Sequence, residues 1–136
     1  MISVKPFKGV ADLKPFTLQK EQGTEEGVEA LEGTAAQAYV VENETETLCI
    51  IYFLEQGGGR ITTGCYMSEK AGPYFLKLKR IYERLLKFYP YKRLEAIVRS
   101  DFKQGVRMVG LLGFEFEGCM KAFYNGKNYD LFARYQ

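Results

Sequence analysis

The sequence has no histidine among its 136 residues. This absence removes the most common general base at neutral pH, and with it the Ser-His and Cys-His nucleophile pairs. Any proton transfer must therefore use Glu, Asp, Tyr, Cys, Lys or a water held by the backbone. Most zinc sites are also excluded, because three scattered cysteines cannot complete a four-ligand shell. We therefore expect no metal site.

Cysteine is scarce as well. Cys49, Cys65 and Cys119 are odd in number and show no Cys-x-x-Cys spacing, which argues against a structural disulfide. Cys49 and Cys119 lie in apolar or strand-like sequence, so we expect both to be small buried residues.

Long apolar runs are absent too. None approaches the ~20 residues of a membrane-spanning helix, and the start MISVKPFKGV lacks the apolar core of a signal peptide. We therefore expect a protein of the cytoplasm with no membrane partner. The length of 136 residues favours one domain spanning 1–136, with a single sizeable core.

The charge is distributed unevenly along the chain. Residues 1–69 carry five Lys and Arg against eleven Asp and Glu, a net charge of −6, whereas residues 70–136 carry fourteen against six, a net charge of +8. Such polarity suits an anionic ligand on the later half, or head-to-tail contact with a charged partner. Two solvated faces of opposite sign are the alternative.

The first third of the chain predicts one strand and an irregular acidic stretch. Residues 2–7 alternate in polarity, and Pro6 suits the edge or the end of a strand. Residues 10–32 are acidic and interrupted by glycines, which allow only short helical pieces, around 11–20 and 25–31.

The middle of the chain predicts strands and then a long helix. Three β-rich segments cover 37–43, 47–55 and 60–68. We interpret Gly57–Gly59 as a hairpin turn, because no helix start follows it. Residues 73–90 predict a helix, since Pro73 suits its first turn and Pro90 its end. Its apolar residues recur at steps of three and four: Phe75, Leu78, Ile81, Tyr82, Leu85 and Leu86.

The last third predicts a strand, a second helix and a hairpin. The strand covers 93–100, and Ser100 or Asp101 can cap a helix over 102–112 that Gly113 ends. Glycines inside this helix, Gly105 and Gly110, each weaken it by ~1 kcal/mol relative to alanine. Strands follow at 114–124 and 128–135, joined by a tight turn at Asn125-Gly126. Altogether the order predicts an α+β (α/β) fold, a mixed, mostly antiparallel sheet of six to seven strands with helices on both faces.

Two stretches carry a resemblance to a known family. They are RLEAIVRSDFKQGVRMVGLLGFEFEG, residues 93–118, and YNGKNYDLFARY, residues 124–135. A helix that ends in Leu-Gly-Phe and a final aromatic hairpin, in this element order, resemble the GNAT superfamily of acyl-CoA-dependent N-acetyltransferases. The resemblance implies a GNAT fold, and for an active member it implies acetyl-CoA as the cofactor and an amine as the acceptor.

The resemblance breaks where the family binds CoA. Family members usually have Gln/Arg-x-x-Gly-x-Gly/Ala between the fourth strand and the long helix, and its amides hold the pyrophosphate. The matching residues, MSEKAGPYFLKLK, keep only Gly72, while Pro73 lacks an N–H and Glu69 adds a negative charge. If the site is active, the resemblance implies that the cofactor lies on Lys70, Ala71 and Gly72.

The family's chemical groups are also replaced. The Asn that opens the second helix falls on Phe102, and the Tyr that often protonates the departing thiolate falls on Val109. Candidates for the general base are Glu69 and Glu95, although Glu95 is better explained as a solvent-facing strand residue, because Leu94 and Ala96 can take the core. The candidates for a substitute acid are Tyr66 and Tyr124.

These departures predict a GNAT-fold protein with an eroded acetyl-CoA site that is non-catalytic and acts through a protein partner. The compact length and the CYMSEK stretch before a basic helix are similar to GNAT-like virion or assembly proteins of tailed phages, which implies the host cytoplasm or the phage particle. An acetyl-CoA-dependent N-acetyltransferase is the alternative, and a homo-oligomer stays open. A second alternative is nucleic-acid binding through the basic residues of the long helix: Lys77, Lys79, Arg80, Arg84 and Lys87.

Overall fold

The computed structural model describes residues 1–19, 22, 31, 34 and 36–136. The chain forms two compact units, Met1–Leu54 with Gly64–Tyr89 and Glu55–Thr63 with Pro90–Gln136. The elements that begin in the first unit are β1 (Ser3–Pro6), η1 (Val10–Asp12), β2 (Gln37–Glu42), β3 (Thr47–Gly57), η4 (Gly72–Tyr74) and α2 (Phe75–Leu86). The remaining elements are β4 (Arg60–Met67), which continues from the second unit into the first, β5 (Arg93–Arg99), α3 (Lys103–Leu111), β6 (Glu115–Tyr124) and β7 (Lys127–Tyr135).

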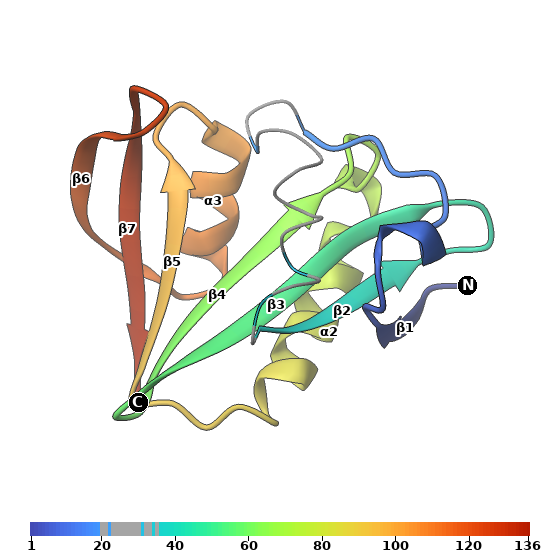
Figure 1. Cartoon of the computed structure of the whole chain (residues 1–136), viewed down its shortest axis with the longest axis horizontal. Helices are drawn as coiled ribbons and strands as arrows, with labels where there is room; N and C mark the ends of the chain where they lie inside the picture. Colours follow the sequence, from blue (N-terminus) through green and yellow to red (C-terminus); the bar gives the residue numbers. More distant parts are fainter. Residues whose placement is uncertain (20–21, 23–30, 32–33, 35) are drawn as a thin grey trace. The chain divides into compact units, whose positions relative to one another are not determined.

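Seven strands are hydrogen-bonded in the order β1-β2-β3-β4-β5-β7-β6 (Figure 1). Antiparallel pairs join β1 to β2, β2 to β3, β5 to β7 and β6 to β7, and β4 runs parallel to β5. The predicted α+β class with a mostly antiparallel sheet is therefore confirmed. So is the edge position of the first strand, which ends at Pro6.

The first unit is built around β3 and α2. Phe53 on β3 stacks on Tyr89 with ring centroids 4.4 Å apart, and it lies 5.6 Å from the ring of Tyr82 on α2. In Figure 1 α2 lies behind β2 and β3. The apolar stripe that predicted this helix is buried, with Leu78, Tyr82, Leu85 and Leu86 in the core.

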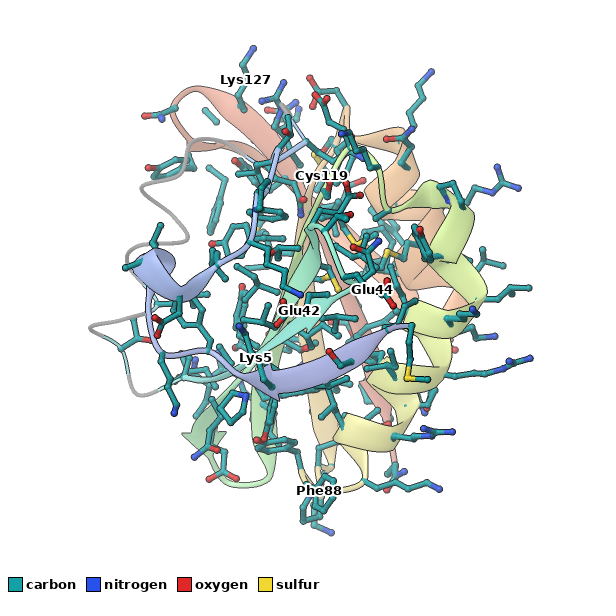
Figure 2. All side chains as sticks on the ribbon, turned by 90° about the vertical axis from the view of Figure 1, so that its right-hand side faces the viewer. Lys5, Glu42, Glu44, Phe88, Cys119 and Lys127 are labelled. Carbon is teal, nitrogen blue, oxygen red and sulfur yellow. The ribbon has the colours of Figure 1, made fainter. Side chains whose placement is uncertain are left out.

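A buried carboxylate on β2 forms ion pairs with two lysines, one of which lies on β1. Glu42 on β2 is 4% exposed, and its oxygens lie 2.9 Å from Lys5 Nζ and 3.1 Å from Lys14 Nζ. Figure 2 shows Lys5 and Glu42 close together on β1 and β2. The hydrogen bond from Lys5 is the main cause that lowers the pKa of Glu42 below 4.5, with Lys14 adding to it against the opposing effect of burial.

The second unit contains the corner at Gly113. Leu94 and Ala96 of β5 are buried, as are Leu112 and Phe114 on either side of the turn. Gly113 has a φ of +85°, its N–H donates to the Gly110 carbonyl, and Phe114 N–H donates to the Val109 carbonyl. This pair of bonds is a Schellman motif, which ends a helix on a left-handed glycine. The predicted corner is confirmed.

Both predicted turns are also confirmed. Gly57, the last residue of β3, and Gly58 and Gly59, which precede β4, have φ values of 90°, 65° and 82°. Asn125 and Gly126 have φ values of 50° and 71° between β6 and β7, as a tight hairpin turn requires.

Three local predictions are wrong. A helical piece around 11–20 is replaced by the 3-10 turn η1, after which residues 13–19 are extended or irregular. Neither Ser100 nor Asp101 caps α3, because the helix starts one residue later, with Phe102 at its N-cap and Asp101 paired to Arg99. Cys119 is exposed because β6 is an edge strand, whereas Cys49 is buried as predicted.

The predicted helical piece around 25–31 lies outside the described residues, apart from residue 31. Within the described part of the chain, no helix is long and apolar enough to cross a membrane.

Replacing each of the two glycines of α3 by alanine should have opposite effects on the free energy of unfolding. A Cβ at Gly105 would lie 2.5 Å from the Phe102 ring and 2.9 Å from Val98, so Gly105→Ala should lower the free energy of unfolding by about 1–3 kcal/mol. A Cβ at Gly110 meets nothing within 4 Å, so Gly110→Ala should raise it by up to ~1 kcal/mol. Urea denaturation of the two variants measures both changes. Equal effects of the two substitutions would contradict the packing described for Phe102.

The Glu42 ion pairs predict a pH dependence of stability. Because the pKa of Glu42 is lower in the folded protein than in the unfolded chain, its contribution is complete above about pH 4.5 and is lost as the pH falls through the folded-state value. Glu42→Gln should lower the free energy of unfolding at neutral pH by about 1–2 kcal/mol, since both lysines keep contact with water. It should also flatten the pH profile between neutral and acidic pH, whereas the exposed control Glu44→Gln leaves most of that slope. Superimposable profiles for wild type and Glu42→Gln would refute the assignment.

Candidate functional site at the outer edge of β4

The site is built on the backbone at the end of β4. Ser68 N–H, one residue after the strand, donates to the Leu48 carbonyl of β3 at 2.9 Å. Successive residues of a strand direct their backbone groups to opposite edges, so the groups of Met67 and Glu69 point away from β3. We call the backbone of Cys65–Glu69 on this side the outer edge of β4. The ladder with β5 uses the same side of the strand, at Arg60–Thr62.

A segment from the N-terminal part of the chain covers this edge. We call Thr17–Gln19 together with Gln22 the strap. Leu18 forms an antiparallel bridge with Ser68, in which Glu69 N–H donates to the Thr17 carbonyl at 2.9 Å and Gln19 N–H donates to the Met67 carbonyl at 3.0 Å. The strap therefore pairs with the end of β4 through one isolated β-bridge.

The side chain of Gln22 completes the pairing. Its Oε1 accepts from Met67 N–H at 2.6 Å, and its Nε2 donates to the Cys65 carbonyl at 2.5 Å. Gln19 Nε2 lies 3.4 Å from the Ser68 carbonyl. A carboxamide has one acceptor and one donor group side by side, so it can bind a strand edge as a backbone amide does.

Local sequence explains why the strap lies here. Phe16 and Leu18 pack against the buried residues Val40 and Ile50, while Thr17 between them points the other way, the period of two of a half-buried strand. Upstream, buried Thr47 fixes the chain: its N–H donates to the Pro15 carbonyl at 2.9 Å, and its hydroxyl donates to the Lys14 carbonyl at 3.0 Å.

The loop between β4 and α2 uses its amides internally. Besides the bonds of Ser68 and Glu69, Lys70 N–H donates to Ser68 Oγ at 3.1 Å, Ala71 N–H to the Ser68 carbonyl at 3.1 Å and Tyr74 N–H to the Ala71 carbonyl at 2.9 Å. Pro73 has no N–H. The turn η4 then runs into α2, with Phe75 N–H bonded to the Gly72 carbonyl. A phosphate binds best where several amides converge on it, and here five of the loop amides already have acceptors in the protein.

The predicted cofactor residues are adjacent but poorly suited to a diphosphate in this conformation. Ala71 is fully buried, and Gly72 is exposed. The ammonium group of Lys70 lies 3.8 Å from Glu46, and its side chain is 70% exposed, so Lys70 is the candidate that is best placed to reach an anion. A pyrophosphate bound through the amides of Lys70 and Ala71 would have to replace their bonds to Ser68.

Two of the predicted catalytic residues lie beside the outer edge of β4. Tyr66 is on β4, packs against the Val40–Ile50 cluster and lies 6.0 Å from the ring of Tyr52. Burial, with smaller effects of Tyr66 and Cys65, raises the pKa of Tyr52 to about 12. Glu69 is exposed in the loop, and its N–H is the group that binds Thr17.

The other two predicted catalytic residues belong to the second unit. Glu95 on β5 accepts a hydrogen bond from Arg60 Nε and lies 3.6 Å from Arg93 Nε, with its side chain 13% exposed. It is therefore held between two guanidinium groups rather than facing solvent alone. Tyr124 is 63% exposed at the end of β6, beside the Asn125-Gly126 turn.

Phe102 and Val109 are the positions at which the resemblance places an Asn and a Tyr. Phe102 is buried, and its ring occupies the space over Gly105. The Val109 carbonyl accepts the Phe114 N–H of the helix-to-strand corner. Neither side chain has a proton to donate.

No family model matches the sequence, and no curated protein matches it. Solved structures do match. An IAA acetyltransferase from Bacillus cereus superimposes with a TM-score of 0.78 at 11% identity, over 100% of both chains. A GNAT family acetyltransferase from Elizabethkingia anophelis with acetyl-CoA bound has a TM-score of 0.71 at 15% identity, over 99% of this chain and 98% of that one. The chain therefore has a GNAT fold.

A variant of the spermidine N-acetyltransferase from Vibrio cholerae agrees, with a TM-score of 0.68 at 10% identity over 99% of this chain and 94% of the other. At these identities the GNAT likeness concerns the fold and not the chemistry.

The strap is the feature that the sequence did not predict. The alternation of Phe16 and Leu18 with Thr17 and Gln19 was a signal for it, and the short helix expected around 11–20 obscured that signal.

Proposed function

We propose that this protein is a GNAT-fold protein whose acyl-CoA site is closed by its own chain, and that it acts on a protein partner through its surface instead of as a constitutive acetyltransferase. The observation that supports this most strongly is the pairing of the strap with the outer edge of β4. In the family that the sequence resembles, the pantetheine arm of CoA enters on this side of the fourth strand. Here the Met67 carbonyl accepts from Gln19 N–H, and Met67 N–H donates to Gln22 Oε1.

The loop amides support the same proposal independently. An acyl-CoA enzyme of this fold offers the amides of the β4–α2 loop to the pyrophosphate, and in this chain those of Lys70 and Ala71 bind Ser68. Ser68 is itself only 2% exposed, so its carbonyl and hydroxyl are fixed within the protein. Opening this loop would leave buried polar groups without partners, at about 1–3 kcal/mol each. A virion or assembly role stays a prediction of the sequence resemblance.

An acetyl-CoA-dependent N-acetyltransferase is the second candidate. It is favoured by the likeness to acetyltransferases over nearly the whole chain, one of them with acetyl-CoA bound. Much of the catalysis in such enzymes comes from holding an amine next to a thioester, so a missing acid at Val109 is no obstacle in principle. This candidate requires the strap to leave the outer edge of β4.

The nucleic-acid alternative rests on α2. Leu76 is 67% exposed there and Phe88, just beyond the helix, is 75% exposed. Figure 2 shows Phe88 pointing away from the protein. The outward cations are Lys77, Arg80, Arg84 and Lys87. Solvated helices commonly carry such residues, so nucleic-acid binding stays a prediction.

Isothermal titration of the wild-type protein with acetyl-CoA tests the proposal. We expect no binding in the micromolar range, and no release of CoA with a panel of a polyamine, an aromatic amine and a peptide amino terminus. The reason is that binding must first break the strap and Ser68 bonds.

Micromolar binding that Gly72→Asp abolishes would overturn the proposal in favour of the second candidate. Gly72 has open space around it, so an aspartate there adds a negative charge beside the loop without a clash. Gly118→Asp on β6, where a side chain also meets nothing within 4 Å, is the matched control.

A further inference from the structure

We propose that the outer edge of β4 is a strand-addition site for an extended peptide segment of a protein partner, which replaces the strap. This inference rests on the proposed function and names the class of partner and the surface that binds it. Strand addition is a common mode of peptide recognition, in which main-chain bonds give affinity and pockets for alternate side chains give specificity. Both features are present at this edge.

The main-chain part of the site is already used in this way. The Thr17 carbonyl and the Gln19 N–H bind the edge as a strand does, so the edge accepts an antiparallel chain without rearrangement. In a regular antiparallel ladder, Met67 would exchange both of its bonds with one residue of the added strand. Here its carbonyl binds Gln19 while its N–H turns to the side chain of Gln22.

That substitution makes the strap an imperfect ligand. Holding the Gln22 side chain in one conformation costs rotamer entropy. A backbone amide of a continuous strand is already fixed, so its hydrogen bond carries no such side-chain cost. A partner segment that stays extended beyond the position of Gln19 makes the Met67 and Cys65 bonds with its own backbone. Such a segment replaces every bond of the strap and needs no carboxamide.

The side-chain part of the site selects an apolar residue. Leu18 packs against Val40 and Ile50, in the same cluster as Tyr66. The residue that bridges Ser68 in the partner must therefore be about the size of leucine. Its neighbour, at the position of exposed Thr17, faces away and is unrestricted.

Competition by the strap sets the affinity that a partner shows. A tethered segment acts at an effective concentration of order millimolar, so it competes strongly with a free peptide. If the strap covers the edge for 99% of the time, the affinity of a free peptide is reduced by about 100-fold. Weakening the strap should therefore strengthen peptide binding, a direction that distinguishes competition from binding elsewhere.

The experiment uses the full chain with the substitutions Gln19→Pro and Gln22→Ala. Together they remove the Gln19 N–H and both carboxamides, and they leave Leu18 and the core intact. The probe is a synthetic peptide of residues 13–22, LKPFTLQKEQ, and the control peptide carries Leu18→Asp. Hydrogen exchange at the amides of Met67 and Glu69, followed by NMR, reports whether the edge is covered. The ring-shifted signals of Phe53 and Tyr89 verify that the variant is folded.

We expect the Met67 amide to exchange at least ~10-fold faster in the variant than in the wild type. The strap peptide should restore its protection, the control peptide should not, and the wild type should bind the strap peptide at least ~10-fold more weakly. A single Gln22→Ala variant should lie between the two. These results together support a strand-addition site.

Three outcomes overturn the inference: an exposed edge that the strap peptide fails to protect, protection of that edge by acetyl-CoA but not by peptide, or unchanged exchange in the variant. The first leaves the proposed function intact, because a closed acyl-CoA site does not depend on peptide binding. Binding of acetyl-CoA by the wild type is the separate result that refutes the proposed function itself.

Discussion

The pairing between the strap and the outer edge of β4 determines which backbone groups of this strand are available to a ligand. A strand edge offers a row of backbone donors and acceptors, and leaving such groups buried without partners costs about as much as the lost hydrogen bonds. Leu18 and Gln22 resolve this within the chain by a β-bridge and a carboxamide. The same backbone groups are the ones that an extended ligand at this edge would bind.

The amides of the β4–α2 loop likewise donate to acceptors within the protein instead of to a ligand. In a GNAT fold this loop precedes a helix N-terminus, a place where amides and the helix dipole favour an anion. Ser68 takes the amides of Lys70 and Ala71, and Pro73 supplies none. The corner at Gly113 keeps the packing of a GNAT fold, while the amides of Lys70 and Ala71 are hydrogen-bonded to Ser68.

Much of the fold was predictable because it depends on local patterns. The helix at 75–86 follows from its apolar stripe, and the left-handed Gly113 follows from the need to end a helix before a strand. The strap was not predicted, because its alternating stretch at 16–19 is short, and because the contact of Gln22 with Met67 spans 45 residues of sequence.

The candidate site residues show the same limit. Lys70, Ala71 and Gly72 could be located from the resemblance, yet which atoms receive their amides depends on Ser68 and its tertiary position. Glu95 was expected to face solvent, and it is instead held by Arg60, a residue 35 positions away. Partners that lie far apart in the sequence decide whether a carboxylate or an amide is available for chemistry.

The pairing of Leu18 with Ser68 can be detected by NMR. In the bridge between Leu18 and Ser68 the two residues form a non-hydrogen-bonded antiparallel pair, whose Cα atoms typically lie ~4.5 Å apart, so their Hα protons should give a strong nuclear Overhauser effect. The account predicts that this signal is present in the wild-type protein and unchanged by millimolar acetyl-CoA. Its absence, or its loss as acetyl-CoA is added, would show that the outer edge of β4 is open to the cofactor.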